Sequence, residues 1–286
     1  MTMRDDFAVF ILTHGRAKQQ KTLETLSKCG YSGKWYLIID DEDDQIKTYY
    51  ERYGKHVIEF SKREVESMFD TMTNAKEYRS VVYARNAVYD IAKSLGIRYI
   101  FMFDDDITGL QFRVVKDNKL KGFKIHQIER LFAGMMEYME SAKLAMLGFS
   151  QAGAYVGGAK SQKYQDGCQR NMSQAMLVDV QNPVEFRGIF NEDLHASLDL
   201  ANQGRVALAT MLVSIQAPER MSNAGGLHDL YMENTTYARD FYSIMLYPAV
   251  ETFVQNKAEI KIRHNHLAFV PKILNARYKK AVQKNA

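Results

Sequence analysis

Apolar and polar positions along the first 110 residues follow the order expected of strands separated by helices. Polar positions with helical character predict one helix over residues 17–29, and apolar residues at helical spacing predict a second over 81–95. Compact β-rich apolar runs predict strands over residues 7–13, 35–39, 56–60 and 97–103. Strands that alternate with helices predict an α/β fold, a mostly parallel sheet with helices on both faces.

The second half of the chain is less regular. Its pattern predicts helices over residues 125–142 and 191–202, the latter with Asn191 as N-cap. Further strands are predicted over 144–149, 174–180 and 206–215, and aperiodic loops over 151–171 and 221–228. Because no linker-like stretch interrupts the chain, we expect a single domain over residues 1–286.

Composition agrees with a globular protein. Of the 286 residues, 46% are hydrophobic and 25% are charged. No apolar run approaches the roughly 18 residues of a membrane span, and the N-terminus lacks the apolar core of a signal peptide. Cys29 and Cys168 have no metal-ligand spacing, so we expect a reducing cytoplasm and no membrane partner.

Three consecutive carboxylates end the most apolar strand of the chain. Asp104, Asp105 and Asp106 follow the run Tyr99-Ile100-Phe101-Met102-Phe103. The first and third carboxylates at a strand end share a side, so Asp104 and Asp106 can converge on one divalent cation. Oxygen ligands favour Mg²⁺ or Mn²⁺, whose task would be to neutralise a pyrophosphate. The alternative is a solvated acidic turn, which is an ordinary way for a strand to end.

Two other strands also end in polar residues. Thr13, His14 and Arg16 follow the first strand, and Asp40 follows the second. In an open α/β sheet, ligands bind beyond the carboxyl ends of the strands. Hydroxyl, guanidinium and carboxylate groups at one edge suit a nucleotide, although each group taken singly is explained by loop solvation.

Two further clusters carry possible chemistry. His264 and His266 lie at i and i+2 on an extended segment and are candidate extra metal ligands, which would favour Mn²⁺, or simply surface histidines. Glu192 and Asp193 open a predicted helix. There they either stabilise the helix dipole or place a general base beside an acceptor hydroxyl.

Taken in order, these residues resemble a GT-A fold glycosyltransferase of the large family-2-like group. The resemblance covers residues 7–215 and adds the segment Ala84-Arg85-Asn86. It implies a nucleotide-sugar donor, a DxD motif at Asp104 and Asp106, and a catalytic base at Asp193 with Glu192 beside it. The donor-binding residues that it implies are Thr13, Arg16, Asp40, Arg85, Asp104 and Asp105. His14 is a further candidate, although many members have a different residue at that place.

Within that group, the chain is similar to phage-type DNA-base glycosyltransferases, also called TET-associated glycosyltransferases. This similarity implies transfer from a UDP-sugar to the hydroxymethyl group of a modified pyrimidine such as hydroxymethylcytosine in phage DNA, in the host cytoplasm. Residues 1–110 would bind the nucleotide and 111–270 the acceptor, followed by a basic tail over 271–286. Candidate DNA contacts are Lys160, Lys163, Arg170, Lys272, Arg277, Lys279, Lys280 and Lys284.

Other functions stay open at this point. The same fold could serve a transferase acting on protein or on a glycan precursor, or a nucleotidyltransferase that releases pyrophosphate. A non-catalytic DNA-binding module is a fourth reading, which the modest net charge of +4 disfavours. The sequence carries no signal for oligomeric state or for the identity of the sugar.

Overall fold

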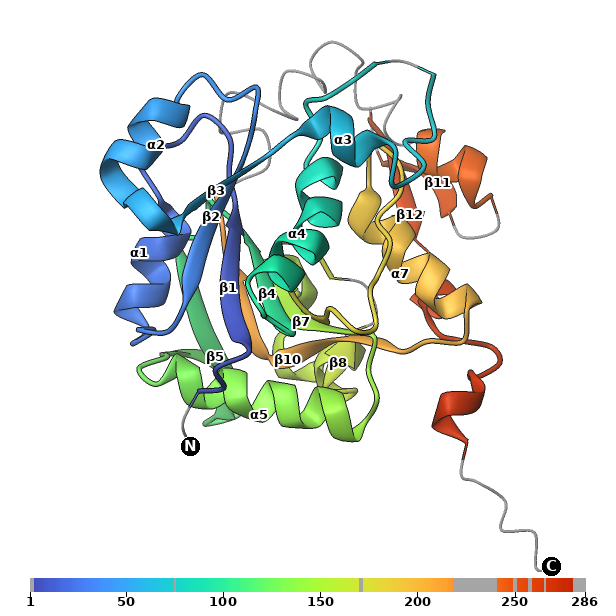
Figure 1. Ribbon diagram of the computed structural model, residues 1–286. Helices are drawn as coiled ribbons and strands as arrows, with labels where there is room; N and C mark the ends of the chain where they lie inside the picture. Colours follow the sequence, from blue (N-terminus) through green and yellow to red (C-terminus); the bar gives the residue numbers. More distant parts are fainter. Residues whose placement is uncertain are drawn as a thin grey trace, which may run out of the picture.

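The apolar runs form the centre of one mixed sheet (Figure 1). The computed structural model describes residues 3–74, 76–169, 172–218, 241–248, 251–256, 259–264 and 266–279. Within these residues, ten strands pair in the order β3-β2-β1-β4-β9-β7-β10-β5-β6, with β8 beside β10. They are β1 (Phe7–Leu12), β2 (Trp35–Asp40), β3 (Val57–Phe60), β4 (Tyr99–Asp104), β5 (Gly109–Lys116), β6 (Lys119–Lys124), β7 (Met146–Gln151), β8 (Cys168–Gln169), β9 (Ala175–Asp179) and β10 (Ala207–Gln216). A separate hairpin pairs β11 (Glu251–Asn256) with β12 (Glu259–His264).

Helices fill most connections between the strands. The α-helices are α1 (Lys21–Lys28), α2 (Ile46–Tyr53), α3 (Lys62–Glu66), α4 (Val82–Ser94), α5 (Ile128–Ser141), α6 (Gln162–Gln165) and α7 (Glu192–Asn202), with a further helix over 241–246. Short 3₁₀ helices are η1 (Gly54–His56), η2 (Ala152–Tyr155), η3 (Gly158–Lys160), η4 (His266–Phe269) and η5 (Ala276–Tyr278). Of the helices in the described part of the chain, none is long and apolar enough to cross a membrane.

Strand direction brings the polar strand ends to one edge. Strands β1 to β4 run parallel to one another, and β7 runs parallel to β10. Strand β9 lies antiparallel between β4 and β7, so β7 and β10 keep the direction of β4. In register, Leu12 lies level with Ile38 on one side and with Asp104 on the other. The residues that follow β1, β2 and β4 therefore share an edge.

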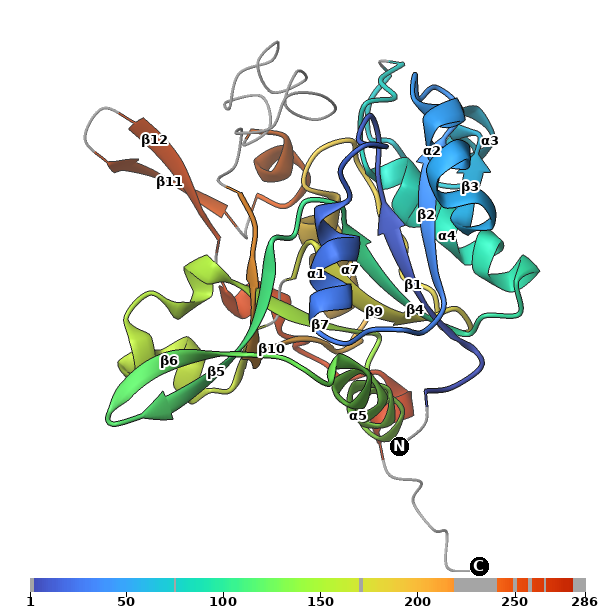
Figure 2. The ribbon, with the colours of Figure 1, turned by 90° about the vertical axis from the view of Figure 1, so that its left-hand side faces the viewer.

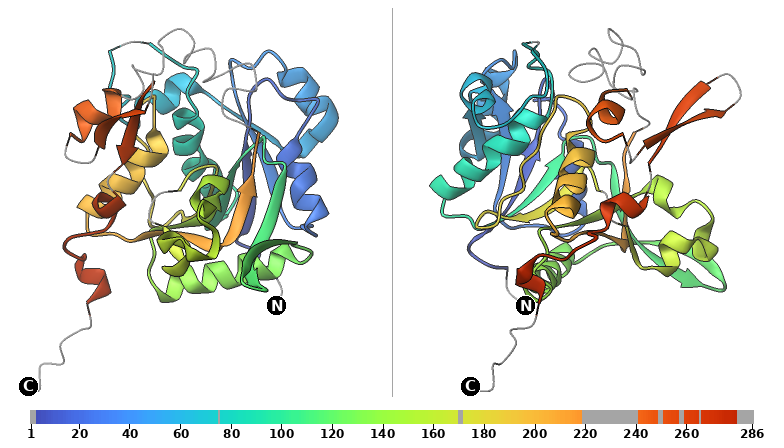
Figure 3. Two further views of the ribbon diagram at one scale, coloured as in Figure 1. Left: turned by 180° about the vertical axis from the view of Figure 1, so that it is seen from behind. Right: turned by 90° about the vertical axis from the view of Figure 1, so that its right-hand side faces the viewer.

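Each face of the sheet has its own core. Odd-numbered residues of β1 pack with α1 and α5, and even-numbered residues pack with α4 and α7. Figure 2 shows α1 and α5 on the first face, and the right panel of Figure 3 shows α4 and α7 on the second. This burial on both sides explains why the central strands are apolar at nearly every position.

The expected fold class is confirmed, and several elements differ from the prediction. The first helix starts at Lys21 rather than at residue 17, because Gln20 donates to the Arg16 carbonyl and Ala17 N–H donates to Gln45 Oε1. Asn191 is the N-cap of α7 as predicted, but its φ is 54° and its side chain donates to Ser243 Oγ at 2.7 Å.

The sequence pattern did not predict several of the short helices and strands. Residues 151–171, predicted as an aperiodic loop, contain η2, η3, α6 and β8, each too short to show a period. The β5–β6 hairpin and the helices α2 and α3 were not predicted, because their apolar positions are interrupted by charged residues. The loop predicted over 221–228 lies outside the described residues.

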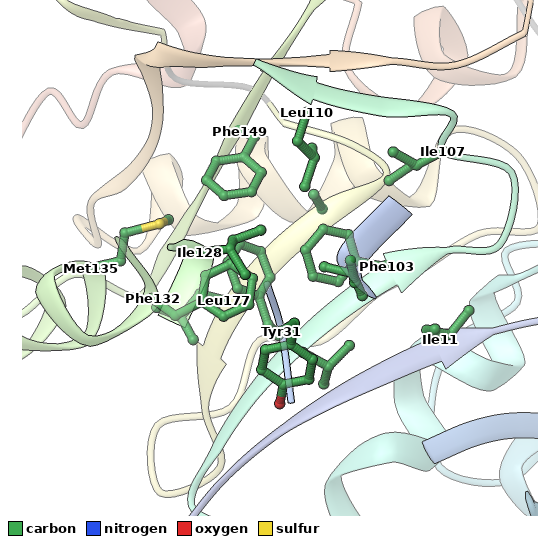
Figure 4. Close-up of a cluster of buried hydrophobic side chains, with 14 of the residues drawn as sticks. Ile11, Tyr31, Phe103, Ile107, Leu110, Ile128, Phe132, Met135, Phe149 and Leu177 are labelled. Carbon is green, nitrogen blue, oxygen red and sulfur yellow. The ribbon is translucent and has the colours of Figure 1, made fainter. Parts of the chain in front are cut away.

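A core residue of α5 provides the first test. Phe132 is fully buried among Phe7, Phe101 and Phe149, with its ring centroid 4.8 Å from that of Phe101 (Figure 4). We expect Phe132→Ala to lower the free energy of unfolding by about 3–5 kcal/mol. Tyr138→Ala on the same helix, 51% exposed, should change it by less than about 0.5 kcal/mol. Urea unfolding followed by circular dichroism measures both, and equal losses would contradict the described packing of α5.

Candidate active site

The acidic turn after β4 is held in place by α1. The Thr22 N–H donates to the Asp105 carbonyl at 3.2 Å, and the Thr22 hydroxyl accepts the Ile107 N–H at 3.0 Å. One turn along the helix, the Thr25 hydroxyl donates to the Ile107 carbonyl at 2.9 Å. These bonds use the backbone of the turn, so its carboxylates remain available for other partners.

The middle carboxylate binds the end of β1. Asp105 is 6% exposed, and its Oδ2 accepts the Thr13 hydroxyl at 2.6 Å. Its Oδ1 pairs with the Arg16 guanidinium, which also lies 4.0 Å from Asp106 Oδ2. Burial raises the pKa of Asp105, and the Arg16 charge opposes that rise. Asp105 thus fixes the loop after β1 to the acidic turn.

A second set of charges joins the ends of β1, β2 and β3. His14 Nδ1 lies 2.7 Å from Asp40 Oδ2, and the buried Lys62 Nζ lies 2.8 Å from Asp40 Oδ1. The hydrogen bond with Asp40 raises the pKa of His14 above its usual value. Burial acts to raise the pKa of Asp40, but the bonds from His14 and Lys62 outweigh it and hold that pKa low. Asp40 is therefore an ionised anchor for His14.

Asp43, Tyr49 and Lys62, which the sequence pattern did not single out, shape this loop. Asp43 Oδ2 accepts the Gly15 N–H at 2.6 Å, and the Tyr49 hydroxyl accepts the Arg16 N–H at 2.9 Å. Gly15 has φ +69°, a conformation that favours glycine. Lys62 could have been found, because it follows the strand predicted over 56–60 and so falls at the same edge.

A buried arginine connects the acidic turn to α7. Arg85 on α4 is 3% exposed. Its Nε donates to Glu192 Oε1 at 2.9 Å and its Nη2 to Asp104 Oδ1 at 3.2 Å. The Phe186 ring lies 5.7 Å from the guanidinium carbon. Arg85 thus compensates two carboxylates that come from elements far apart in the sequence.

The carboxylates nevertheless remain in excess of the positive charge. Burial raises the pKa of Asp104 to about 6; Arg85 opposes this, while Asp106, Asp105 and Asp193 add to it. Burial also raises the pKa of Glu192 to about 7, again against Arg85. A cation at the turn would relieve this repulsion.

Asp193 differs from its neighbour in exposure. Glu192 is 5% exposed and faces Arg85, whereas Asp193 is partly exposed in the first turn of α7. Asp193 Oδ1 accepts the Leu194 N–H at 2.7 Å, which leaves the other carboxylate oxygen for a different partner. Of the two, Asp193 is the one that a ligand can reach.

The carboxylates at the acidic turn are suitable ligands for a hard divalent cation. Asp104 and Asp106 supply carboxylate oxygens with partly exposed side chains, 27% and 22%. No group of three or more His, Cys, Asp or Glu in the described residues could hold a metal by itself. Mg²⁺ needs no such cage, because it is commonly bound by one or two carboxylates together with substrate phosphates. The side chains of His264 and His266 lie outside the described residues, so their metal role stays a prediction.

The predicted DNA-contacting residues lie in two places. Lys160 ends η3 and Lys163 lies on α6, both on the connection between β7 and β9. In the tail, the Tyr278 hydroxyl accepts the Val206 N–H, so this segment lies by the start of β10, at the edge opposite the acidic turn. Arg170, Lys280 and Lys284 are outside the described residues.

Comparison with known proteins supplies the family. A family profile described as TET-Associated Glycosyltransferase matches residues 7–226, more than three quarters of the chain. The chain belongs to this family. It is therefore a glycosyltransferase by family, and its sheet with helices on both faces has the α/β class expected from the sequence. A search of curated proteins finds no match.

Solved structures similar to this glycosyltransferase are distant. TarS 1-349 of S. aureus in complex with UDP is 13% identical, with a TM-score of 0.42 over 73% of this chain. The chain spans 60% of that TarS fragment. Glucosyl-3-phosphoglycerate synthase from Mycobacterium tuberculosis, in complex with Mg²⁺ and UDP, is 9% identical, with a TM-score of 0.47 over 91% of this chain and 87% of that one. Similarities this distant support no argument about ligands.

The charge bridge at Arg85 gives the second test. Arg85→Met leaves Asp104 and Glu192 without their shared cation, so we expect the free energy of unfolding at neutral pH to fall by about 3–5 kcal/mol. Arg85→Met combined with Glu192→Met removes one of the stranded charges and should recover at least about 1 kcal/mol of that loss. Urea unfolding measures both variants.

A matched control separates this effect from the loss of any arginine. Arg130 is exposed on α5. Within the described residues, its guanidinium donates a hydrogen bond to Gln127 Oε1 alone. Arg130→Met should change the free energy of unfolding by less than about 0.5 kcal/mol. If Arg85→Met were as mild as this control, Arg85 would not be the compensating charge.

Proposed function

We propose that this glycosyltransferase moves a sugar from a UDP-sugar to an acceptor hydroxyl with the help of Mn²⁺ or Mg²⁺. The proposed acceptor is the 5-hydroxymethyl group of a modified pyrimidine, hydroxymethylcytosine, in phage DNA. One observation carries the donor half of the proposal: the ends of β1, β2 and β4 bring carboxylates and a guanidinium to a single edge of the sheet. The family match carries the acceptor half.

Exposure separates residues that can touch the donor from those that position them. The side chains of His14 and Arg16 are 44% and 31% exposed, so both can reach the base, ribose or diphosphate of a nucleotide. Thr13 and Asp40 are only 7% and 5% exposed, and both are hydrogen-bonded within the protein. The proposed role of Thr13 is to hold Asp105, which orients Arg16. The proposed role of Asp40 is to orient His14. Asp105 and Arg85 belong to the same positioning group.

Asp104 and Asp106 would hold the divalent cation. When bound, the cation neutralises the diphosphate and makes it a better leaving group. The residues fit this role because their carboxylates are partly exposed and crowded with like charge. Arg85 keeps Asp104 oriented from the buried side at 3.2 Å.

Asp193 is the proposed general base, with Glu192 as a positioning residue. The acceptor oxygen forms a bond to the anomeric carbon of the sugar, and the bond from that carbon to the diphosphate oxygen breaks. Asp193 takes the hydroxyl proton and UDP leaves with the bonding electron pair, as in an inverting displacement. Glu192 is too buried to meet the acceptor, and its bond to Arg85 ties α7 to Asp104.

A DNA acceptor imposes two further requirements. Its hydroxymethyl group must leave the base stack to reach the carboxylates, which base-modifying enzymes achieve by flipping the nucleotide. The duplex must also be held by its phosphates, for which Lys160 and Lys163 are described candidates.

The metal-binding carboxylates give the third test. Asp104→Asn and Asp106→Asn should each lower sugar transfer by about a hundredfold or more, because the developing diphosphate charge loses its counterion. In the wild type, UDP with Mn²⁺ at about 100 times the dissociation constant should stabilise the fold by about 2.7 kcal/mol, and both variants should lose most of this in thermal unfolding.

Asp90→Asn serves as the control. Asp90 is exposed on α4 and pairs only with Lys93 at 2.7 Å among its described contacts, so the variant should retain both turnover and stabilisation. Normal metal-dependent turnover in Asp104→Asn and Asp106→Asn would remove the metal assignment.

The acceptor gives the fourth test. Incubation of the wild type with Mn²⁺, a panel of UDP-sugars and hydroxymethylated duplex DNA should yield glycosylated nucleoside and free UDP, measured by mass spectrometry after nuclease digestion. Unmodified DNA should give no product, because it lacks the hydroxyl. Transfer to protein or to a glycan precursor in parallel reactions, with none to DNA, would overturn the acceptor assignment. Release of pyrophosphate instead of UDP would identify a nucleotidyltransferase.

A further inference from the structure

The β5–β6 hairpin extends beyond the body of the sheet (Figure 2). It follows the acidic turn directly in sequence and ends the sheet with β6 as its edge strand. It carries five basic residues and one acidic residue over residues 109–124. The proposed reaction uses none of them.

One face of the hairpin combines exposed lysines with exposed apolar groups. Strand pairing sets Val114 opposite Lys121, Lys116 opposite Lys119, and Phe112 opposite Phe123. These residues share a face because side chains of neighbouring positions alternate. Val114 and Phe123 are each 40% exposed, and Lys116 and Lys119 are exposed. We call this set the lysine face.

The opposite face is covered by another part of the chain. The Arg113 guanidinium lies 5.0 Å from the centre of the Tyr155 ring, and the Tyr164 hydroxyl donates to the Arg113 carbonyl at 3.2 Å. Leu120 packs into the same small cluster. The covering segment, residues 152–169, adds Lys160 and Lys163. Arg113 and Leu120 on this face are therefore packed, although Val115 beside them is 47% exposed. On the lysine face, Phe112 packs against the main core, and Val114, Lys116, Lys119 and Phe123 are exposed in the described part of the chain.

Charge is concentrated in this region of the molecule. Residues 109–124 and 152–169 together hold seven basic and two acidic residues, a net charge of +5. The whole chain carries +4, so the remainder is net −1. The pairing of Lys116 with Lys119 places like charges directly opposite one another, which destabilises a hairpin. A polyanion bound there would turn this repulsion into attraction.

Protection of the sheet edge explains only part of the pattern. Edge strands often carry lysine to prevent pairing with other strands. That role accounts for Lys119, Lys121 and Lys124 on β6. It also covers Lys116, because β5 pairs with β10 only as far as Phe112 and its last residues pair with β6 alone. It does not account for the apolar Phe123, which is exposed on the edge strand itself.

We propose that the lysine face of the β5–β6 hairpin binds the phosphate backbone of duplex DNA, at a distance from the reacting base. This proposal rests on the proposed DNA acceptor. A two-stranded ribbon also fits the width of the major groove, where Phe123 and Val114 can contact apolar base edges. Strand β5 has eight residues, so about 26 Å of strand separates the acidic turn from the hairpin tip, the length of about eight base pairs.

A triple variant tests the lysine face. Lys116→Gln, Lys119→Gln and Lys121→Gln combined should leave the melting temperature of the protein near that of the wild type, because all three side chains reach solvent. Fluorescence anisotropy with an unmodified duplex measures the binding constant as a function of salt concentration. The slope of log binding constant against log salt concentration should become less steep by about 2 to 3, because each lost phosphate contact lowers the magnitude of the slope by about 0.9. The KM for a long hydroxymethylated duplex should rise at least about fivefold.

Two controls make the result specific. Lys28→Gln, Lys47→Gln and Lys93→Gln combined remove the same charge from exposed positions on α1, α2 and α4 and should reproduce the wild-type salt slope. A hydroxymethylated trinucleotide is too short to reach the hairpin, so its KM should be the same for the wild type and both triple variants.

The outcomes separate this inference from the proposed function. Equal salt slopes for the two triple variants would overturn the role of the hairpin, even with full transfer to DNA. If the wild type leaves hydroxymethylated DNA unmodified, the acceptor assignment fails, and the slope measured with unmodified duplex still decides whether the hairpin binds DNA. A raised KM for the trinucleotide in the hairpin variant would also overturn the proposed role of the hairpin, because the lysines would then act at the reacting site.

Discussion

The architecture of the site depends on one buried cation. Arg85 is removed from water and bonds to Asp104 at the end of β4 and to Glu192 at the start of α7. Without it, two carboxylates would share a poorly solvated space, and burial already raises the pKa of both. The bond fixes the spacing between the acidic turn and the first turn of α7, which is the space in which donor and acceptor would meet. Asp193 is placed by this bond, although it does not take part in it.

Negative charge exceeds positive charge around the acidic turn. Among the described residues there, Arg16 and Arg85 face five carboxyl groups, those of Asp104, Asp105, Asp106, Glu192 and Asp193. Such an excess is costly in a stable fold with no ligand, since each desolvated charge needs a partner. In the proposed reaction, a divalent cation bound with the donor diphosphate would supply that partner while substrate is present.

The sequence predicted the groups of this site better than their roles. Long apolar runs identified the central strands because both faces of the sheet are covered, and the polar residues at their ends then had to share an edge. The division between exposed His14, which can meet a ligand, and buried Asp40, which orients it, depends on packing by Lys62 from β3's end. That packing has no local signal. The β5–β6 hairpin was missed for a related reason: charges on both of its faces erase the alternation typical of a half-buried strand.

The uneven distribution of charge also bears on how a duplex would approach. With the hairpin region at +5 and the remainder near neutrality, the field of the protein attracts a polyanion to one end, whereas the acidic turn repels it. A duplex that came first to the carboxylates would meet repulsion before any base could be flipped. In the proposed arrangement the phosphates are held about 26 Å from the acidic turn. Binding of the duplex and delivery of the flipped base to the carboxylates then take place at separate sites. The hairpin can then supply affinity without neutralising the carboxylates that the cation and the acceptor hydroxyl need.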